Sequence, residues 1–340
     1  MALEVGELTE FWGRPTATID WCENNYEVTN YIAEFWNTLS NLVMILLPIY
    51  GIYWSIKQKR SKKKLNNFVI RNSTLSVYFA LMMIGSGSWL FHMTLLYPMQ
   101  LLDELPMIYG FGFGLYALFD ILESAYQLEN EANFYEKKTN LPSRFTVFIL
   151  IALYCLLVTY IYIFVWSDPI FHEIAFGLMV AMVVTLGYKT LLMYKLSKKL
   201  YILALTYLIL AFGFWNLDNN FCGHLQKYRH GVERIFGINR INLNEINIRA
   251  LLLNVIVVTL KVFSEFHSLW HLLTGISAYL AILCLTELNY EHHLKSCKIK
   301  DTKKRPVNST CFNMFYDFAR VENETTKKVK STSKVRVKYY

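Results

Sequence analysis

The chain has 340 residues, of which 54% are hydrophobic, 16% aromatic and only 18% charged. Soluble domains usually carry about 25% charged residues, so this composition excludes a disordered chain and disfavours an ordinary soluble enzyme. The formal net charge of +8 is carried by the last part of the chain, because residues 295–340 hold 13 Lys and Arg against 4 Asp and Glu. The rest of the chain is nearly neutral. Basicity confined to one end indicates a tail and excludes a nucleic-acid-binding face.

Long apolar segments recur along the chain, at 33–56, 73–92, 100–122, 145–166, 170–192, 200–222 and 264–288. A helix of about 20 apolar residues crosses roughly 30 Å of hydrocarbon. We therefore predict an all-α membrane protein with seven transmembrane helices. Residues 1–30 are acidic and contain no apolar run, so no signal peptide is expected. A further apolar run at 250–262 is too short to span a bilayer, and we place it in a luminal or interfacial excursion.

The distribution of Lys and Arg predicts the orientation of the bundle. The loops after the first and fifth spans and the segment after the seventh are basic, whereas the turns after the second and fourth spans carry no Lys or Arg. Because cytosolic loops are enriched in Lys and Arg, the N-terminus is expected in the lumen and the C-terminus in the cytosol. The predicted organisation is a luminal segment (1–32), a seven-helix catalytic domain (33–288) with a luminal or interfacial insertion (239–262), and a disordered basic tail (289–340).

Three histidines have the spacing of a metal site. Ser88 precedes His92 by four residues at the end of the second span. His267 likewise precedes His271 by four residues at the start of the seventh span. Residues four apart share one face of a helix, so such a pair can bind one metal ion. The predicted topology places the three histidines, with Asp103 at the start of the third span, at a similar depth below the luminal surface.

Three neutral imidazoles leave a fourth position open for water, which is typical of a catalytic zinc site. Asp103 is the candidate proton acceptor, and Ser88 can orient water or substrate. A lone histidine in a membrane helix is more often a hydrogen-bonded helix contact, and we interpret His172 in this way. Glu34, Asn37 and Asn41 form a polar stripe that should face the bundle, and residues 214–219 are expected to supply its partners.

Two features mark the predicted luminal N-terminal segment. Residues 20–26 are rich in oxygen ligands, which suit Ca²⁺, although spacing alone favours a solvated acidic segment. An unpaired carboxylate at the membrane edge needs a partner, so the presence of Glu34 favours a bound Ca²⁺ over a merely solvated segment. Of the six cysteines, Cys22 and Cys222 are the two that the topology places at the oxidising luminal face. We predict that they form a disulfide.

Several blocks resemble the alkaline ceramidase family in order along residues 10–290. They are FWG at 11–13, DWCE at 20–23, YIAEFWNTLS at 31–40, GSWLFHMT at 87–94, MQLLDELPMIY at 99–109, FWNLDN at 214–219 and HSLWHLLTG at 267–275. The resemblance implies a seven-helix amidase of the endoplasmic reticulum or Golgi that hydrolyses ceramide to a sphingoid base and a fatty acid. Its partners would be ceramide and membrane lipids, not nucleic acid.

The resemblance also implies ligand sets. Zinc would be bound by His92, His267 and His271, with Ser88 and Asp103 beside the bound water. The chain is most similar to members that also bind Ca²⁺. In this chain the Ca²⁺ ligands would be Asp20, Trp21, Glu23, Asn25 and Glu34. Trp21 would contribute its backbone carbonyl, as Glu23 could.

The chain departs from the family at about 239–262, where relatives pass directly into the helix of His267. A true insertion and a gene-model artefact both fit. The alternative function is a zinc-containing seven-helix receptor, similar to the adiponectin receptors, which share both histidine patterns. Those receptors have the opposite orientation, which the basic loops disfavour. A transporter or structural membrane protein is a third class, but it would not need three histidines at one depth.

Overall fold

A computed structural model describes residues 11–60, 70–133, 141–194, 196, 198–236 and 264–303. Apart from one isolated bridge between Thr29 and Ile32, the regular structure in these ranges is helical. The helices are α1 (Phe35–Ser40), α2 (Leu42–Arg60), α3 (Asn72–Thr94), α4 (Tyr97–Asn133), α5 (Arg144–Phe164), α6 (Pro169–Tyr194), α7 (Lys199–Phe236) and α9 (Phe266–Lys303). Seven helical stretches are long and apolar enough to cross a membrane, with α1 and α2 together forming the first. The predicted all-α, seven-span architecture is confirmed.

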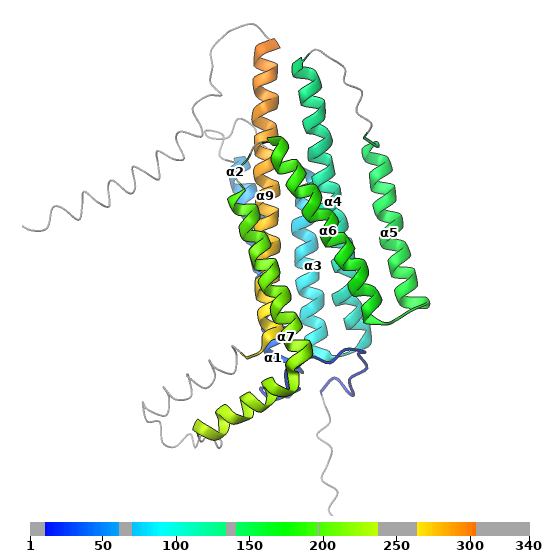
Figure 1. The fold of residues 1–340 in the computed structure, drawn as a ribbon, viewed down its shortest axis with the longest axis vertical. Helices are drawn as coiled ribbons and strands as arrows, with labels where there is room; N and C mark the ends of the chain where they lie inside the picture. The colour runs from blue at the N-terminus through cyan, green and yellow to red at the C-terminus, as the bar shows by residue number, and fades with distance from the viewer. Residues whose placement is uncertain are drawn as a thin grey trace, which may run out of the picture.

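The long helices lie side by side in one bundle (Figure 1). α3 packs along α4 and α2, while α9 packs along α7 and also contacts α2, α3 and α4. α5 lies at the edge, where it packs against α4 and α6. Its buried residues are Cys155, Val158 and Tyr162, and much of the rest of its apolar surface points outward. An apolar outer surface of this kind is what hydrocarbon solvation requires.

Local sequence explains where several helices begin, end or bend. The Ser143 hydroxyl accepts a hydrogen bond from the Thr146 amide at 3.1 Å and caps the start of α5. Leu95, at φ 51°, ends α3 in the left-handed region and turns the chain directly into α4. Phe221 has non-helical backbone angles and kinks α7, so the last part of α7 runs away from the bundle axis (Figure 1).

Two apolar clusters hold the bundle together away from the histidines. One joins α4, α6 and α9 through Ala117, Leu118, Ile121, Ala125, Tyr194, Leu285 and Leu288. The other joins α2, α3 and α9 through Met44, Tyr78, Leu81 and Ile282. At the far end of the bundle, the Asp120 carboxylate pairs with Arg71 at 2.9 Å and with Arg144 at 3.0 Å. These contacts fix α3 and α9 relative to each other, and these two helices carry the three histidines.

The last helix extends past the predicted start of the tail at 289. α9 does not end at 288 but continues to Lys303. Two polar contacts beyond 288 explain the difference: the Asn289 amide donates to the Thr74 hydroxyl at 2.5 Å, and His292 lies 3.0 Å from the Tyr194 hydroxyl. The predicted insertion at 239–262, with its apolar run, and the tail from 304 onward lie outside the described residues.

Candidate metal centre

Three imidazoles converge at the end of the bundle where α3 ends and α9 begins. His92 lies in the last turn of α3, and His267 and His271 lie in the first two turns of α9. One ligand atom from each ring lies within 4.8 Å of the other two, and each residue is at most 3% exposed. Within the ranges that the structure describes, no other group of three His, Cys, Asp or Glu side chains converges in this way. The predicted common depth of these histidines is therefore present in the fold.

His92 is oriented by a buried carboxylate. Its Nδ1 atom lies 2.5 Å from the Glu34 carboxylate, and both side chains are fully buried. If Nδ1–H donates to the carboxylate, the proton is absent from Nε2, which is buried without a hydrogen-bond partner. The backbone adds to this placement, because the Glu34 amide donates to the His92 carbonyl at 2.9 Å. An imidazole held by a carboxylate through one nitrogen and unpaired at the other is typical of a metal ligand.

His271 is oriented by the backbone of α1. Its Nδ1 atom lies 3.1 Å from the Asn37 carbonyl oxygen and 3.1 Å from the Ser40 hydroxyl. A carbonyl oxygen only accepts, so Nδ1 carries the proton and Nε2 keeps its lone pair. The polar stripe of the first span thus faces the bundle as predicted, with Glu34, Asn37 and Asn41 all fully buried.

His267 is fixed by contacts from the N-terminal segment and from α7. Its ring stacks on the Trp21 indole, with centroids 3.6 Å apart and planes 18° apart. Its backbone amide donates to Asp218 Oδ1 at 3.2 Å, and Asp218 Oδ2 accepts from the Cys22 amide at 3.2 Å. The expectation that residues 214–219 serve the polar stripe of the first span is wrong for Asp218. Its carboxylate instead accepts hydrogen bonds from two backbone amides that are far apart in sequence. No local sequence pattern indicates such a contact.

Ser88 and Asp103 meet where α3 crosses α4. The Ser88 hydroxyl lies near the Asp103 carboxyl group, close enough to interact with it. Gly87 makes this approach possible, because a Cβ atom there would lie 2.6 Å from the Leu102 carbonyl carbon. Ser88 is 2% exposed and lies one helical turn before His92, on the same face of α3. The two candidate catalytic side chains are therefore paired with each other beside the histidines.

The residue after Asp103 belongs to a second buried network. The Tyr162 hydroxyl donates to the Glu104 carboxylate at 2.5 Å, and Gln100 reaches the same carboxylate at 3.4 Å. His172 Nε2 lies 2.9 Å from the Glu104 carbonyl oxygen. His172 is thus a helix contact, as predicted, and it ties α6 to the turn of α4 that carries Asp103.

The five predicted Ca²⁺ ligands come from one stretch of the N-terminal segment and from Glu34. The side-chain amide of Asn25 donates to the Asp20 carboxylate at 3.4 Å, and the backbone amide of Trp21 donates to the Glu34 carboxylate at 3.3 Å. The Glu23 carboxylate accepts the Trp36 and Asn37 amides at 2.7 and 2.8 Å, so it caps α1. Its backbone carbonyl is then the group left for an ion. Burial raises the pKa of Glu23 to about 8.

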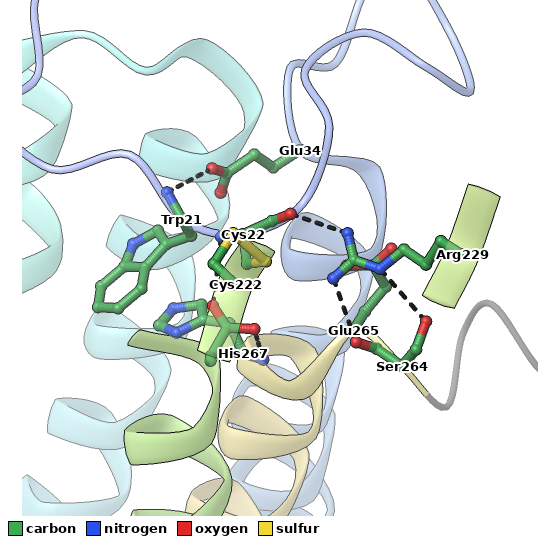
Figure 2. The surroundings of a disulfide bond; sticks show 9 residues. Trp21, Cys22, Glu34, Cys222, Arg229, Ser264, Glu265 and His267 are labelled. Carbon is green, nitrogen blue, oxygen red and sulfur yellow. Dashed lines mark hydrogen bonds and ion pairs between the residues drawn. A yellow bond between two sulfur atoms is a disulfide. The ribbon is translucent and has the colours of Figure 1, made fainter. Parts of the chain in front are cut away.

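A disulfide anchors the N-terminal segment to α7. Cys22 and Cys222 are bonded, with Cα atoms 5.3 Å apart and a sequence separation of 200 residues (Figure 2). The predicted pairing is present. Cys155, Cys284 and Cys297 are not disulfide-bonded. The bond lies beside Trp21 and His267 (Figure 2), so the covalent link joins two elements of the histidine environment.

Comparison with known proteins agrees with the resemblance. The family model described as Ceramidase matches residues 13–240. Alkaline ceramidase 3 of Mus musculus is 37% identical over 80% of this chain and 84% of its own length. Alkaline ceramidase YPC1 of Saccharomyces cerevisiae is 32% identical over 82% of this chain and 78% of its own. Putative alkaline ceramidase dcd3A of Dictyostelium discoideum is 30% identical over 79% and 85%. With a family match over most of its length and these relatives, the chain belongs to the ceramidase family.

Proposed function

We propose that this protein is an intramembrane zinc-dependent amidase that hydrolyses ceramide to a sphingoid base and a free fatty acid. The observation that carries the proposal is the convergence of three buried imidazoles beside the Ser88–Asp103 pair. The relatives named as alkaline ceramidases support ceramide as the substrate. The site combines a place for a metal ion with a carboxyl group, which are the groups that metal-assisted amide hydrolysis needs.

The three histidines fit a bound zinc ion. His92 Nε2 is buried without a partner, and a buried polar atom without a partner costs free energy unless a ligand uses it. His92 and His271 are each held by the protein through Nδ1, which is the arrangement that orients zinc-binding histidines. When bound by these residues, zinc would supply a Lewis acid for the amide carbonyl and would lower the pKa of a coordinated water towards 7.

The protein's own groups then move the protons. Asp103 accepts a proton as the water oxygen attacks the carbonyl carbon of the amide. When the carbon–nitrogen bond breaks, the same carboxyl group returns that proton to the leaving amine nitrogen. Ser88, which lies near Asp103, holds the carboxyl group in place or donates to the oxyanion that forms. The products are a fatty acid and a sphingoid base, and one water is consumed.

We also propose that Ca²⁺ binds the N-terminal segment through Asp20, Trp21, Glu23, Asn25 and Glu34. The pairing of Asn25 with Asp20 and of the Trp21 amide with Glu34 supports this by bringing these residues together. Trp21 and Glu23 would offer backbone carbonyls, because the Glu23 carboxylate already accepts two amides. Ca²⁺ would brace the segment against α1 and take no part in bond cleavage.

The proposed location is a membrane of the endoplasmic reticulum or Golgi, with the histidines towards the lumen. The Cys22–Cys222 disulfide supports this orientation, because disulfides persist in oxidising compartments and this one lies beside the histidines. The basic loops of the sequence favour the same orientation, with the N-terminus luminal and the C-terminus cytosolic.

Zinc content and turnover of a fluorescent ceramide test the function together. Wild-type protein should contain one zinc per chain and hydrolyse the ceramide, whereas His271→Ala should lose both. His224→Ala is the matched control, because His224 is exposed on α7 and lies outside the cluster. Full ceramide turnover by a zinc-free His271→Ala protein contradicts the mechanism. Zinc without turnover in the wild type favours the receptor alternative.

A further inference from the structure

One buried arginine joins three separate segments next to the histidines. Arg229 lies in the last part of α7, beyond the kink at Phe221, and is 2% exposed. Its guanidinium donates to the Cys22 carbonyl at 2.8 Å (Figure 2). On its other side it contacts the Ser264 hydroxyl at 3.3 Å, the Ser264 carbonyl at 3.2 Å and the Glu265 carboxylate at 2.9 Å. A guanidinium presents its donors in a fixed planar fork, so these contacts fix the relative positions of the three segments.

These contacts act on the first turn of α9. Ser264 and Glu265 directly precede α9, which begins at Phe266, and His267 is its second residue. The Glu265 carbonyl accepts from the Leu269 amide at 3.2 Å and from the Ser268 hydroxyl at 2.7 Å. Glu265 is therefore already part of the hydrogen bonding of this turn. A displacement of Glu265 must be transmitted to His267 two residues later.

The same arginine acts on His267 from the opposite side. The Cys22 carbonyl that it binds belongs to the residue after Trp21, whose ring stacks on the His267 ring. The Asp218 carboxylate of α7 binds the amides of both Cys22 and His267. α7 thus places the backbone of His267 and its stacking partner with two charged side chains, one on each side of the kink.

The arginine also bridges the position at which the chain departs from its family. Residues 237–263 separate Arg229 from the residues that it binds at 264 and 265. A contact across this segment means that the start of α9 can be set by Arg229 and not by the length of the connection. Neutralising Glu265 would require only one positive charge, and lysine supplies that. Binding two carbonyls, a hydroxyl and a carboxylate together requires the fork of arginine.

We propose that Arg229 is a positioning residue for the metal ligand His267, holding together the residues on either side of segment 237–263 so that α9 begins in register with His92. This inference rests on the proposed function, because it takes His267 to be a metal ligand. Arg229 makes no contact with substrate in this proposal. Its effect is on the geometry and affinity of the metal site.

The test uses full-length protein in detergent, loaded with Co²⁺ as a spectroscopic probe of the ligand geometry. The variants are Arg229→Met, which removes the donors, and Arg229→Lys, which keeps the charge without the fork. Lys227→Met is the matched control, because Lys227 lies on the same turn of α7 and is not buried. Measurements are the visible ligand-field bands, the chelator concentration that strips the metal, and ceramide turnover. All are recorded well below the unfolding temperature of each variant.

Arg229→Met should alter the cobalt bands and lose the metal at a chelator concentration at least about tenfold lower, since supporting contacts are worth about 10–100-fold in metal affinity. The cobalt bands and metal retention of Arg229→Lys should lie between those of Arg229→Met and the wild type. Those of Lys227→Met should match the wild type. The inference is overturned if Arg229→Met has the same cobalt bands and the same metal retention as Lys227→Met, even if its melting temperature falls. If Arg229→Met does not fold, wild-type bands and retention in Arg229→Lys overturn it. Wild-type protein that binds no Co²⁺ and hydrolyses no ceramide overturns the proposed function itself.

Discussion

α3 and α4 approach each other closely at Gly87, beside Ser88 and Asp103, and this contact yields a prediction for both activity and stability. A Cβ atom on Gly87 would overlap the Leu102 carbonyl oxygen and would lie 2.6 Å from the Leu102 carbonyl carbon and 3.2 Å from the Asp103 amide nitrogen. Carbon atoms in contact prefer about 3.5–4.0 Å. Gly87→Ala therefore forces α3 and α4 apart by about 1 Å, at the point where Ser88 meets Asp103.

Two effects of opposite sign act on the stability of this variant. Replacing glycine by alanine inside a helix stabilises it by about 1 kcal/mol. Forcing an extra carbon into a packed contact costs about 1–3 kcal/mol. Because the atoms in the way are backbone atoms, which cannot turn aside as a flexible side chain can, the cost outweighs the gain and the variant should be less stable than the wild type, by about 2 kcal/mol. A displacement of about 1 Å at reacting groups can lower a rate by about 100-fold, so the loss should appear in kcat/KM for ceramide.

The assay compares ceramide turnover, zinc content and melting temperature in Gly87→Ala and Gly114→Ala. A Cβ atom added to Gly114, on α4, would have no neighbouring atom within 4 Å. Gly114→Ala should therefore keep wild-type turnover. In Gly87→Ala, turnover per bound zinc should fall about 100-fold, so the loss of turnover should exceed any loss of zinc. Wild-type kcat/KM in Gly87→Ala would refute the idea that this helix contact positions the Ser88–Asp103 pair.

Three further predictions concern the N-terminal segment. Glu34→Gln replaces the carboxylate that orients His92 and should lower metal affinity about 10–100-fold in a chelator competition; unchanged affinity contradicts the role of Glu34. Burial raises the pKa of Glu23 from 4.5 to about 8, so the folded protein keeps a proton that the unfolded chain has lost. Stability must then fall between about pH 4.5 and 8, and Glu23→Gln should flatten the melting temperature over this range with Ca²⁺ chelated. Cys22→Ser should cost about 2–4 kcal/mol and abolish the reductant-dependent gel shift of the wild type, and a shift that persists contradicts the Cys22–Cys222 pairing.

The seven spans were predictable because each depends only on its own composition and length. The same holds for the histidine pattern, since a spacing of four residues places two side chains on one face of a helix. Orientation rules then placed the ends of different spans at one depth, and in the structure His92, His267 and His271 meet there. The Cys22–Cys222 pair followed from the same topological argument.

Contacts between distant segments could not be predicted in this way. Arg229 looks like one basic residue among several in an amphipathic stretch, and nothing local indicates that it binds Cys22 and Glu265. The Glu23 carboxylate caps α1, although its sequence neighbours favour a role in ion binding. The continuation of α9 past the predicted start of the tail has a related reason. Asn289 and His292 look like the start of a polar tail, and only their partners on α3 and α6 extend the helix.

The N-terminal segment and α1 are together as much a part of the metal centre as the helices that carry the histidines. His92 is held by Glu34, His271 by the Asn37 carbonyl, and His267 by the ring of Trp21. Residues 21–40 thus contact all three rings, whereas the bundle alone places their Cα atoms. A histidine whose second nitrogen has no partner can rotate and change tautomer, which weakens metal binding. The orientation of the three rings therefore depends on how residues 21–40 pack against α3 and α9, so substitutions in these residues should weaken metal binding although none of them is a histidine.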